Sequence, residues 1–388
     1  MAMCVEDRIS SFPDHILFHI LSFLPIKDAV RTSIISTKWR YLFASISTIK
    51  FDGSLMSGLT DRNVDSFKNF VDRLLKFPDQ EIDLDLKNLG DTLPALLFTC
   101  HSLVTLKLDA VDSEIKVPSD VCLGNLKTLQ LRNSVLFGDS IHRLISNCHV
   151  LEDLAFIECG FDNISEVNIQ SPSLKRLVLE FDVTEGRYFN YVVVINAPIL
   201  VYFQYHAAVA ASYTLSTMKS LEKADISIYQ FDSINSETSA THLIQGICNV
   251  RSLSLTTDAA IFLTSGLPIF HNLIEFKYLG VGFNGRETWL VEFLHCVPNL
   301  KTLTLNFPDD AGTRWKALRM KVPSCLSFHL KEIEISYFDP RMIEMGADWR
   351  GTWLVEFLHC DLAVTKTRLL ASACQVLWSS GVIHVVIN

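Results

Sequence analysis

Ten cysteines and twelve histidines are the side chains of this chain best suited to metal binding or nucleophilic chemistry. Common zinc sites use closely spaced pairs of such residues, and the sequence contains no C-x-x-C or H-E-x-x-H motif. It also lacks the phosphate-binding G-x-x-x-x-G-K-[ST] motif and the G-x-S-x-G motif of hydrolases. We therefore expect no metal, no cofactor and no catalytic activity. A catalytic site whose residues only folding brings together stays open as an alternative.

Four of the cysteines share a position relative to a leucine-rich motif. They lie two to four residues before a copy of the motif, at Cys100, Cys148, Cys248 and Cys296. A small, partly apolar thiol suits a buried corner between a helix and a strand. We interpret these cysteines as packing residues and not as metal ligands.

The composition of the chain limits its class. The chain has 388 residues, 49% of them apolar, and a formal net charge of −9. An acidic chain without a basic run binds polyanions poorly, so we expect no nucleic-acid partner. Residues 1–11 are polar and charged, unlike a signal peptide, and the most apolar stretch, residues 192–213, contains Asn, Pro, Gln and His. We therefore expect no membrane span, and a location in the cytoplasm, the nucleus or both.

The leucine-rich motif is L-x-x-L-x-L with conservative replacements, and it recurs ten times at intervals of 21 to 30 residues. The copies begin at Leu103, Leu126, Leu151, Leu174, Leu200, Leu221, Val250, Leu273, Leu300 and Leu330. This period is typical of leucine-rich repeats, whose units bury their apolar faces only by stacking on one another. We predict an α/β fold with a strand at each L-x-L triplet, helical or irregular return segments, and an irregular solenoid over residues 81–336.

The residue between the two apolar positions of each triplet should point away from the core, because side chains alternate across a strand. Stacking would align these residues in one column: Lys107, Gln130, Ala155, Val178, Gln204, Asp225, Ser254, Lys277, Thr304 and Glu334. The column is neutral, with two lysines and two acids, which suits a protein or peptide. We predict target contacts at Lys107, Gln130, Val178, Gln204, Asp225 and Lys277, with the loops as the alternative surface. Outward positions of this kind should tolerate substitution.

Residues 7–50 lack the repeat. One apolar helical stripe is formed by Ile16, Leu17, Ile20, Leu21 and Leu24. Ser11 and Pro13 should begin this helix and Pro25 should end it, and we expect two further short helices, the last of which carries Trp39. Three short helices offer fewer interior positions than this segment has apolar residues. The segment is therefore either a cap of the repeats or a docking module with an exposed apolar surface.

The sequence FPDHILFHILSFLPIKDAVRTSIISTKWRYLF, residues 12–43, resembles the F-box of plant F-box proteins with leucine-rich repeats. It departs mildly from that pattern at Phe12, Ile26 and Phe43. The resemblance implies docking on the Skp-type adaptor, and through it on the cullin scaffold, of an SCF-type ubiquitin ligase. It assigns adaptor contacts to Phe12, Pro13, Ile16, Leu17, Ile20, Pro25 and Trp39, the last as part interface and part core.

Other segments flank the repeats. Residues 51–80 have the apolar spacing of one amphipathic helix, and we expect a helical linker there. Residues 81–86, EIDLDL, alternate in polarity and predict a capping strand. Residues 322–335 resemble the opening of the FBD region that closes many plant F-box/leucine-rich-repeat proteins. We therefore expect a partial, divergent FBD-like region over residues 322–360.

The end of the sequence contains a copied segment. The nonapeptide TWLVEFLHC occurs at residues 288–296 and again at residues 352–360, which indicates a duplication. Residues 361–388 follow the second copy and match no pattern of the family. We expect this aberrant tail to be dispensable for adaptor binding and poorly integrated with the repeats.

These features together favour a substrate-recognition subunit of an SCF-type ligase. The F-box would dock the adaptor, the repeats would capture an unknown target protein, and the chain would do no chemistry itself. Two other interpretations stay open: a recognition scaffold that assembles no ligase, and a sensor that holds a small molecule in the repeats. Adaptor binding distinguishes the ligase subunit from the scaffold.

Overall fold

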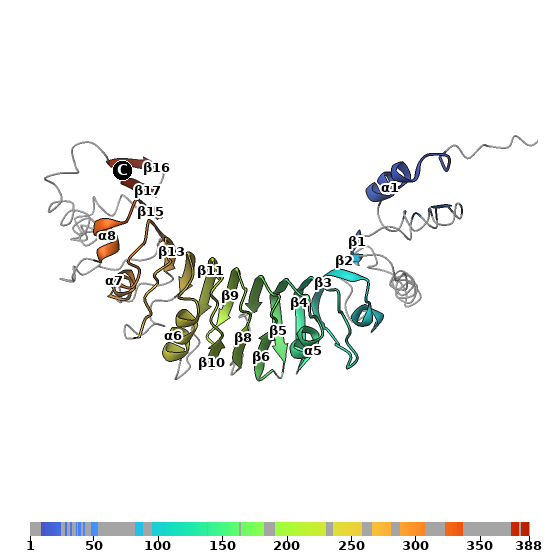
Figure 1. Cartoon of the computed structure of the whole chain (residues 1–388), viewed down its shortest axis with the longest axis horizontal. Helices are drawn as coiled ribbons and strands as arrows, with labels where there is room; N and C mark the ends of the chain where they lie inside the picture. The colour runs from blue at the N-terminus through green and yellow to red at the C-terminus, as the bar shows by residue number, and fades with distance from the viewer. Residues whose placement is uncertain are drawn as a thin grey trace, which may run out of the picture. The chain divides into compact units, whose positions relative to one another are not determined.

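A computed structural model describes most of the repeat region and parts of both ends of the chain. The described residues are 9–24, 28, 32, 36, 38–39, 42, 48–52, 82–87, 95–137, 139–162, 164–181, 191–229, 236–257, 266–280, 288–306, 323–336, 374–379 and 382–387. The chain divides into unit 1, Met1–Ile164, and unit 2, Ser165–Asn388. Within the described residues the fold is α/β, with mostly parallel strands and few helices (Figure 1).

Unit 1 contains a parallel sheet in the order β1-β2-β3-β4-β5. Its strands are β1 (Thr48–Asp52), β2 (Ile82–Lys87), β3 (Leu103–Glu114), β4 (Thr128–Phe137) and β5 (Asp153–Asp162). Its helical segments are α1 (Asp14–Phe23), the 3₁₀ helix η2 (Ala95–Thr99) and α5 (Ser140–Ser146), which packs on β4. Strand β2 confirms the strand predicted at EIDLDL, but it does not cap the sheet, because β1 pairs with its other side.

Unit 2 contains a larger sheet in the order β7-β9-β11-β12-β13-β14-β15-β17-β16. Its parallel strands are β7 (Arg176–Phe181), β9 (Tyr202–Ala208), β11 (Lys223–Tyr229), β12 (Ser252–Thr257), β13 (Glu275–Gly280), β14 (Thr302–Asn306) and β15 (Glu332–Ser336). Strands β16 (Cys374–Ser379) and β17 (Val382–Ile387) form an antiparallel pair, and β17 also pairs antiparallel with β15. The helices of unit 2 are α6 (Ser236–Gly246), α7 (Thr288–His295) and α8 (Ser324–Phe328).

A second, three-stranded parallel sheet in unit 2 has the order β10-β8-β6. Its strands are β6 (Glu166–Gln170), β8 (Val192–Asn196) and β10 (Ser212–Leu215). These are return segments between repeats, for which a helical or irregular structure was predicted. They are rich in β-branched residues and too short for a stable helix, which favours strands. The most apolar stretch of the chain, residues 192–213, holds β8, β9 and the first two residues of β10.

Each of the ten L-x-L triplets lies in a parallel strand, as predicted, and the apolar side chains of the triplets whose burial the structure describes are buried. The starts of neighbouring strands are aligned by backbone hydrogen bonds. In these bonds, the N–H of the residue after the first apolar residue of a repeat donates to the carbonyl of the equivalent residue in the previous repeat. In unit 2 the backbone N–H of Arg251 donates to the carbonyl of Glu222 at 2.9 Å. The N–H of Ile274 donates in turn to Arg251, and that of Lys301 to Ile274, each at 2.9 Å. We call this series the start ladder.

The interior of unit 2 also contains three tyrosines that meet at their hydroxyl groups. The Tyr205 oxygen lies 3.1 Å from that of Tyr191 and 3.2 Å from that of Tyr213, and it donates to the carbonyl of Ala208 at 3.1 Å. Burial raises the pKa of Tyr213 to about 12, and it raises the pKa of Tyr191 and Tyr205 as well. These phenols therefore stay protonated and hold the two sheets of unit 2 together by hydrogen bonds.

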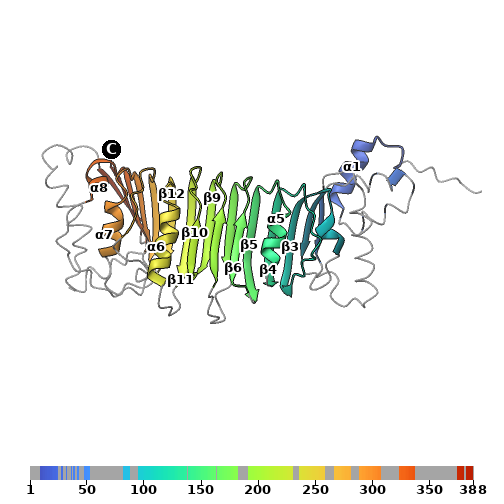
Figure 2. The same ribbon diagram turned by 60° about the horizontal axis from the view of Figure 1, so that its bottom comes forward.

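Helices cover parts of the return side of the sheets. α6 packs on β10, and α7 packs against α8 (Figure 2). The return segments that form α5 and α7 agree with the prediction of helical or irregular return segments. At the end of α6, a Cβ placed on Gly246 would lie 2.8 Å from the Cβ of Leu215 on β10. The helix therefore approaches β10 closely only because residue 246 lacks a side chain.

The expectation of a poorly integrated tail is wrong for the residues that the structure describes. Within the tail, Val382–Ile387 pairs with β15, and Cys374–Ser379 extends the sheet by one more strand. An unpaired edge of a parallel sheet exposes backbone donors and acceptors, and an apolar strand satisfies them. The predicted linker helix and the second TWLVEFLHC copy lie outside the described residues.

Candidate functional site

The N-terminal segment has a small core beneath α1. This core consists of Leu17, Leu21, Trp39 and Leu42, with Phe18 and Leu24 packed against it. Leu17 is fully buried and Trp39 is 3% exposed. Both were predicted as adaptor contacts, Trp39 as part interface and part core. In the free chain both side chains are packed in the core of the segment.

The opposite side of this segment presents large apolar side chains to solvent. The exposed fractions of these side chains distinguish them from the core residues. They are 56% for Ile9, 47% for Phe12, 38% for Ile16, 36% for Ile20 and 73% for Phe23. Positions 16, 20 and 23 share one side of the helix by their spacing. We call these five residues the apolar row. A contiguous exposed apolar surface of this kind is typical of a docking site.

The start of α1 is fixed by contacts across the segment. The Lys38 ammonium donates to the carbonyls of Ser10 at 3.0 Å and Phe12 at 2.9 Å, and it pairs with the Asp14 carboxylate at 3.2 Å. The Trp39 indole N–H donates to the Ser10 hydroxyl at 2.8 Å. These bonds orient Phe12 at the entrance of the helix. They join residues 24 to 29 positions apart, so no local sequence pattern indicates them.

The predicted adaptor residues therefore fall into distinct groups. Phe12, Ile16 and Ile20 lie in the apolar row, whereas Leu17 and Trp39 lie in the core. Pro13 is exposed and occupies the N-cap of α1, and no side chain makes a capping hydrogen bond there. Pro25 and most of the two further predicted helices lie outside the described residues.

The second candidate surface is the face of the larger unit 2 sheet that carries the residues between the repeat leucines. We call it the polar face. In strand register its central row is Val178, Gln204, Asp225, Ser254, Lys277, Thr304 and Glu334. This register confirms the predicted column within unit 2. Lys107, Gln130 and Ala155 are likewise in register within unit 1.

Val178 and Ala155 correct the predicted exposure of the column. Each side chain is only 2% exposed, whereas Lys107 and Lys277 are exposed and Gln130, Gln204 and Asp225 are half-buried. Val178 is short, lies between Arg176 and Glu180 on its strand, and is in register with Gln204 on the next strand. Longer neighbours thus cover it, and Val178 is a packing residue and not an accessible contact.

A chain of polar contacts crosses β7, β9, β11 and β12 on the polar face. The Arg176 guanidinium lies 5.1 Å from the centre of the Tyr202 ring, whose hydroxyl donates to the Gln204 oxygen at 2.9 Å. The Gln204 amide nitrogen lies 3.3 Å from Nδ1 of His206, and Nε2 of His206 lies 3.3 Å from the Asp225 carboxylate.

Asp225 is held in its charged form by these neighbours. Burial raises the pKa of its carboxyl group, but the hydrogen bond and charge of His206, the Ser254 hydroxyl and the charge of Lys223 lower it, and the net pKa is below 3.8. Sequence reasoning chose Gln204 and Asp225 but missed Tyr202 and His206. The alternation of polar side chains at positions 202, 204 and 206 was the available signal.

Three buried cysteines are not suited to nucleophilic chemistry. Burial raises the pKa of Cys148 and of Cys159 to about 12 and that of Cys325 to about 11, so these thiols stay protonated. The predicted packing role fits Cys100 and Cys148, which are buried, while Cys248 and Cys296 are half-buried. Among the described residues, no group of three or more His, Cys, Asp or Glu side chains could hold a metal ion.

One further motif has an enzymatic association. Gly280, Gly282 and Gly285 have the G-x-G-x-x-G spacing of dinucleotide-binding loops, between β13 and α7. Such loops bind nucleotides where the strand order of a sheet reverses. β13 instead lies between β12 and β14 in simple chain order, so the described topology offers no such crevice.

No helix within the described residues is both long and apolar enough to cross a membrane. Two family descriptions match the chain. Residues 9–50 match the F-box domain. Residues 75–225 match the family described as FBD-associated F-box protein At5g56370, LRR repeats.

Proteins of Arabidopsis thaliana are similar to most of the chain. F-box/LRR-repeat protein At3g59250 is 33% identical over 350 residues, covering 83% of this chain and 80% of that protein. F-box/LRR-repeat protein At3g59200 is 32% identical, with coverages of 89% and 79%. Putative F-box/FBD/LRR-repeat protein At3g59240 is 33% identical, with coverages of 92% and 81%.

Proposed function

This chain belongs to the plant F-box/LRR-repeat family, and on that basis we propose that it is the substrate-recognition subunit of an SCF-type cullin–RING ubiquitin ligase. Residues 7–50 form a three-helix F-box that docks on a Skp-type adaptor and through it on a cullin. The repeats of residues 81–336 form the solenoid that captures a target protein, and residues 322–360 are a partial FBD-like region. The chain acts in the cytoplasm, the nucleus or both.

The proposed role is non-catalytic and needs no cofactor. Holding a target beside a charged ubiquitin-conjugating enzyme raises the effective concentration of the target's lysines, which accelerates transfer without chemistry in this chain. The raised pKa values of Cys148, Cys159 and Cys325 support this role, because a ubiquitin-carrying cysteine must be a reactive thiolate.

The observation that carries the proposal is the apolar row beside α1. Its five large side chains are exposed in the free chain although the segment has its own core, and they fall within the F-box match. An amphipathic helix binds a groove through a few such anchors spaced by one helical turn. We therefore assign adaptor contact to Ile9, Phe12, Ile16, Ile20 and Phe23, and the orientation of α1 to Leu17 and Trp39.

The test is co-elution of the purified full chain with a Skp-type adaptor. Replacing Ile16 and Ile20 by aspartate should weaken binding about 100-fold or more, because each unpaired carboxylate buried in an interface costs several kcal/mol. Phe23→Asp is a second variant, since Phe23 is 73% exposed and its replacement leaves the core beneath α1 intact. Leu17→Asp is unsuitable, because Leu17 is fully buried and the change would unfold the segment.

The matched control places two carboxylates elsewhere on the same helix. His15 and Ser22 are exposed and lie on the flank of α1 away from the apolar row, so His15→Asp with Ser22→Asp should bind the adaptor as the unaltered chain does. Equal binding by both double variants would reject the apolar row as the docking surface. A folded chain that binds no Skp-type adaptor at all would instead be a recognition scaffold or a ligand sensor.

A further inference from the structure

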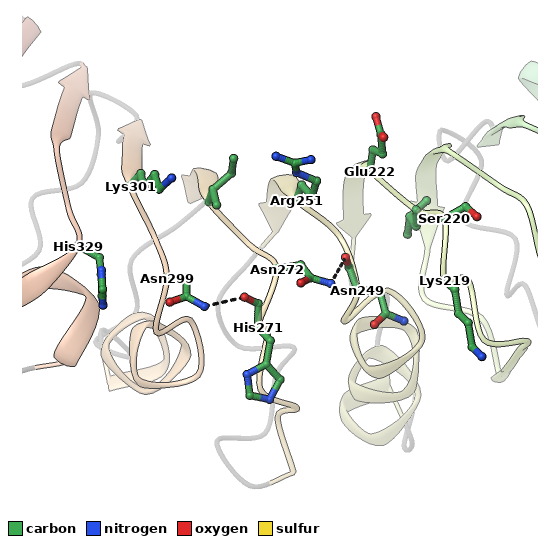
Figure 3. A pocket seen from close by; sticks show the side chains of 12 residues that line it. Lys219, Ser220, Glu222, Asn249, Arg251, His271, Asn272, Asn299, Lys301 and His329 are labelled. Atoms are coloured by element: carbon green, nitrogen blue, oxygen red, sulfur yellow. Dashed lines mark hydrogen bonds between the residues drawn. The ribbon is translucent and has the colours of Figure 1, made fainter.

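A groove in unit 2 lies at the beginning of the repeat strands, beside the start ladder. It has a volume of about 600 Å³ and takes its lining from five successive repeats, from Lys219 to His329 (Figure 3). We call it the entry groove. It is separate from the predicted column, because its lining residues precede the strands that carry the column.

The lining of the entry groove is basic. It includes Lys219, Arg251 and Lys301, and Glu222 is the one acid among the described lining residues. His271 and His329 also line the groove and offer imidazole nitrogens for hydrogen bonds. The local excess of positive charge contrasts with the net charge of −9 of the whole chain. Long-range attraction of an anionic ligand would therefore be directed to this groove.

The lining is held in place before any ligand binds. The Asn299 amide donates to the carbonyl of His271 at 2.8 Å, and the Asn272 amide donates to that of Asn249 at 3.3 Å. Figure 3 shows these two asparagines in a line across neighbouring repeats. Arg251 and Lys301 are rungs of the start ladder, so their backbones are fixed as well. A pre-ordered lining loses little conformational freedom on binding.

The form of the groove suits an extended peptide. Neighbouring strands lie about 4.8 Å apart, so five repeats span about 19 Å, the length of about six residues of extended chain. Exposed apolar side chains adjoin the lining residues in sequence: Ile269 is 55% exposed two residues before His271, and Phe328 is 79% exposed directly before His329. Neither apolar residue lines the groove itself, so apolar contacts would lie next to its basic lining.

We propose that the entry groove binds an acidic, partly apolar stretch of extended peptide in the target protein. Its carboxylates pair with Lys219, Arg251 and Lys301, and its apolar side chains contact Ile269 and Phe328. The inference deepens the proposed function by giving the chemistry of the target, but peptide binding itself does not require the adaptor.

The charge distribution favours a peptide over a nucleic acid. A nucleic acid brings a phosphate with every nucleotide and needs many cations, and three permanent cations line the groove. Carboxylates on the neighbouring strands, at Glu275, Glu332 and Glu334, would repel a longer polyanion. A peptide can place a few carboxylates at the basic positions and present other side chains elsewhere.

The test is fluorescence anisotropy with the full chain and a short labelled peptide in which glutamate and leucine alternate. Arg251→Glu with Lys301→Glu should weaken binding at least about tenfold, because reversed charges repel the ligand. Binding of the unaltered chain should also weaken as salt is raised. The same peptide with glutamine in place of glutamate should bind at least about tenfold more weakly to the unaltered chain.

The control variant changes the same position of earlier repeats. Lys127 and Lys175 also follow the first leucine of a repeat but lie outside the groove, so Lys127→Glu with Lys175→Glu makes the same change of net charge. This variant should bind the glutamate peptide as the unaltered chain does. Equal loss in both variants, equal binding of the two peptides, or tighter binding of a single-stranded RNA would overturn the proposal. Co-elution of each variant with the adaptor reports separately on the proposed function.

Discussion

At the scale of single residues, Val178 shows that an outward position on a sheet does not by itself make a side chain exposed. It occupies an outward position of β7, yet longer neighbours cover it. We expect Val178→Glu to lower the free energy of unfolding by at least about 2 kcal/mol, because it buries a carboxylate without a matched partner. Urea denaturation followed by circular dichroism measures this change.

The control for Val178 is Lys277, which is exposed in the same row of the polar face. Lys277→Glu should change the free energy of unfolding by no more than about 0.5 kcal/mol. If Val178→Glu lowers the free energy of unfolding as little as Lys277→Glu does, the neighbouring side chains do not cover Val178. Position 178 would then tolerate substitution, as the sequence predicted.

Asp225 should make stability depend on pH in the acid range. Its pKa in the folded chain is below the ordinary value of 3.8, because interactions with His206 on β9, Ser254 on β12 and Lys223 outweigh the effect of burial. A lowered folded-state pKa adds stability above the unfolded-state value, and this stability is lost as pH falls through the folded-state pKa.

Asp225→Asn should therefore be less stable than the unaltered chain at neutral pH. The difference between the two melting temperatures should shrink as the pH drops below 3.8. Thermal unfolding of both chains across this range measures the difference. A constant difference down to the lowest pH would show that Asp225 contributes through geometry and not through its charge.

The sequence predicted buried and exposed residues well where a periodic pattern decides them. The burial of the repeat leucines follows from such a pattern, whereas the contact role of Phe12, Ile16 and Ile20 came from the resemblance to the F-box. The burial of Val178 and the contacts of Lys38 with Ser10 and Phe12 follow from neither, because they depend on neighbours distant in the chain. The predicted role of these residues in binding remains a prediction.

At the scale of elements, the contact between α6 and β10 depends on the absence of a side chain at residue 246. Gly246→Ala should lower the free energy of unfolding by about 1–3 kcal/mol, because the new methyl group would overlap Leu215 and force the helix or the strand to move. Urea denaturation gives the magnitude. Hydrogen exchange in α6 should also become faster.

Gly124 is the matched control for Gly246. A Cβ placed on Gly124 meets no atom within 4 Å, so Gly124→Ala should leave stability unchanged or raise it slightly by restricting the unfolded chain. If Gly246→Ala is as stable as Gly124→Ala, α6 has room to shift. The close approach of α6 to β10 would then contribute nothing to stability.

The return elements limit how far the fold could be predicted. The apolar spacing of Thr288–His295 is compatible with the helix that the structure shows there. Runs such as Val192–Asn196 are short, and a short apolar run fits a buried strand or a helix turn equally well. Packing decided between them: in β6, β8 and β10 the strands pair with one another into a second sheet.

At the scale of the whole molecule, the tail completes the sheet of unit 2. Deleting residues 374–388 should leave β15 paired on one side only, so its amides should exchange with solvent faster. Hydrogen–deuterium exchange with mass spectrometry measures this. Strand β12 lies between β11 and β13 and serves as the internal control, with no change expected.

A point substitution provides an independent check of the tail. Val385 lies in β17 opposite Ile333, and Val385→Pro removes a backbone N–H from the middle of that pairing. It should speed exchange in β15 as the deletion does. Unchanged protection of β15 in both variants would restore the earlier expectation that the tail is poorly integrated.

The start ladder has a consequence for how such chains diversify. Every rung joins backbone groups only, at the same position of each repeat, while the side chain at that position varies from glutamate to arginine, isoleucine and lysine. A genetic crossover at a rung would exchange whole repeats and keep the backbone joints intact. Descendant proteins would thus have an altered binding surface on an unchanged fold. The repeated nonapeptide TWLVEFLHC shows that segments of this chain have been copied, although neither copy contains a rung.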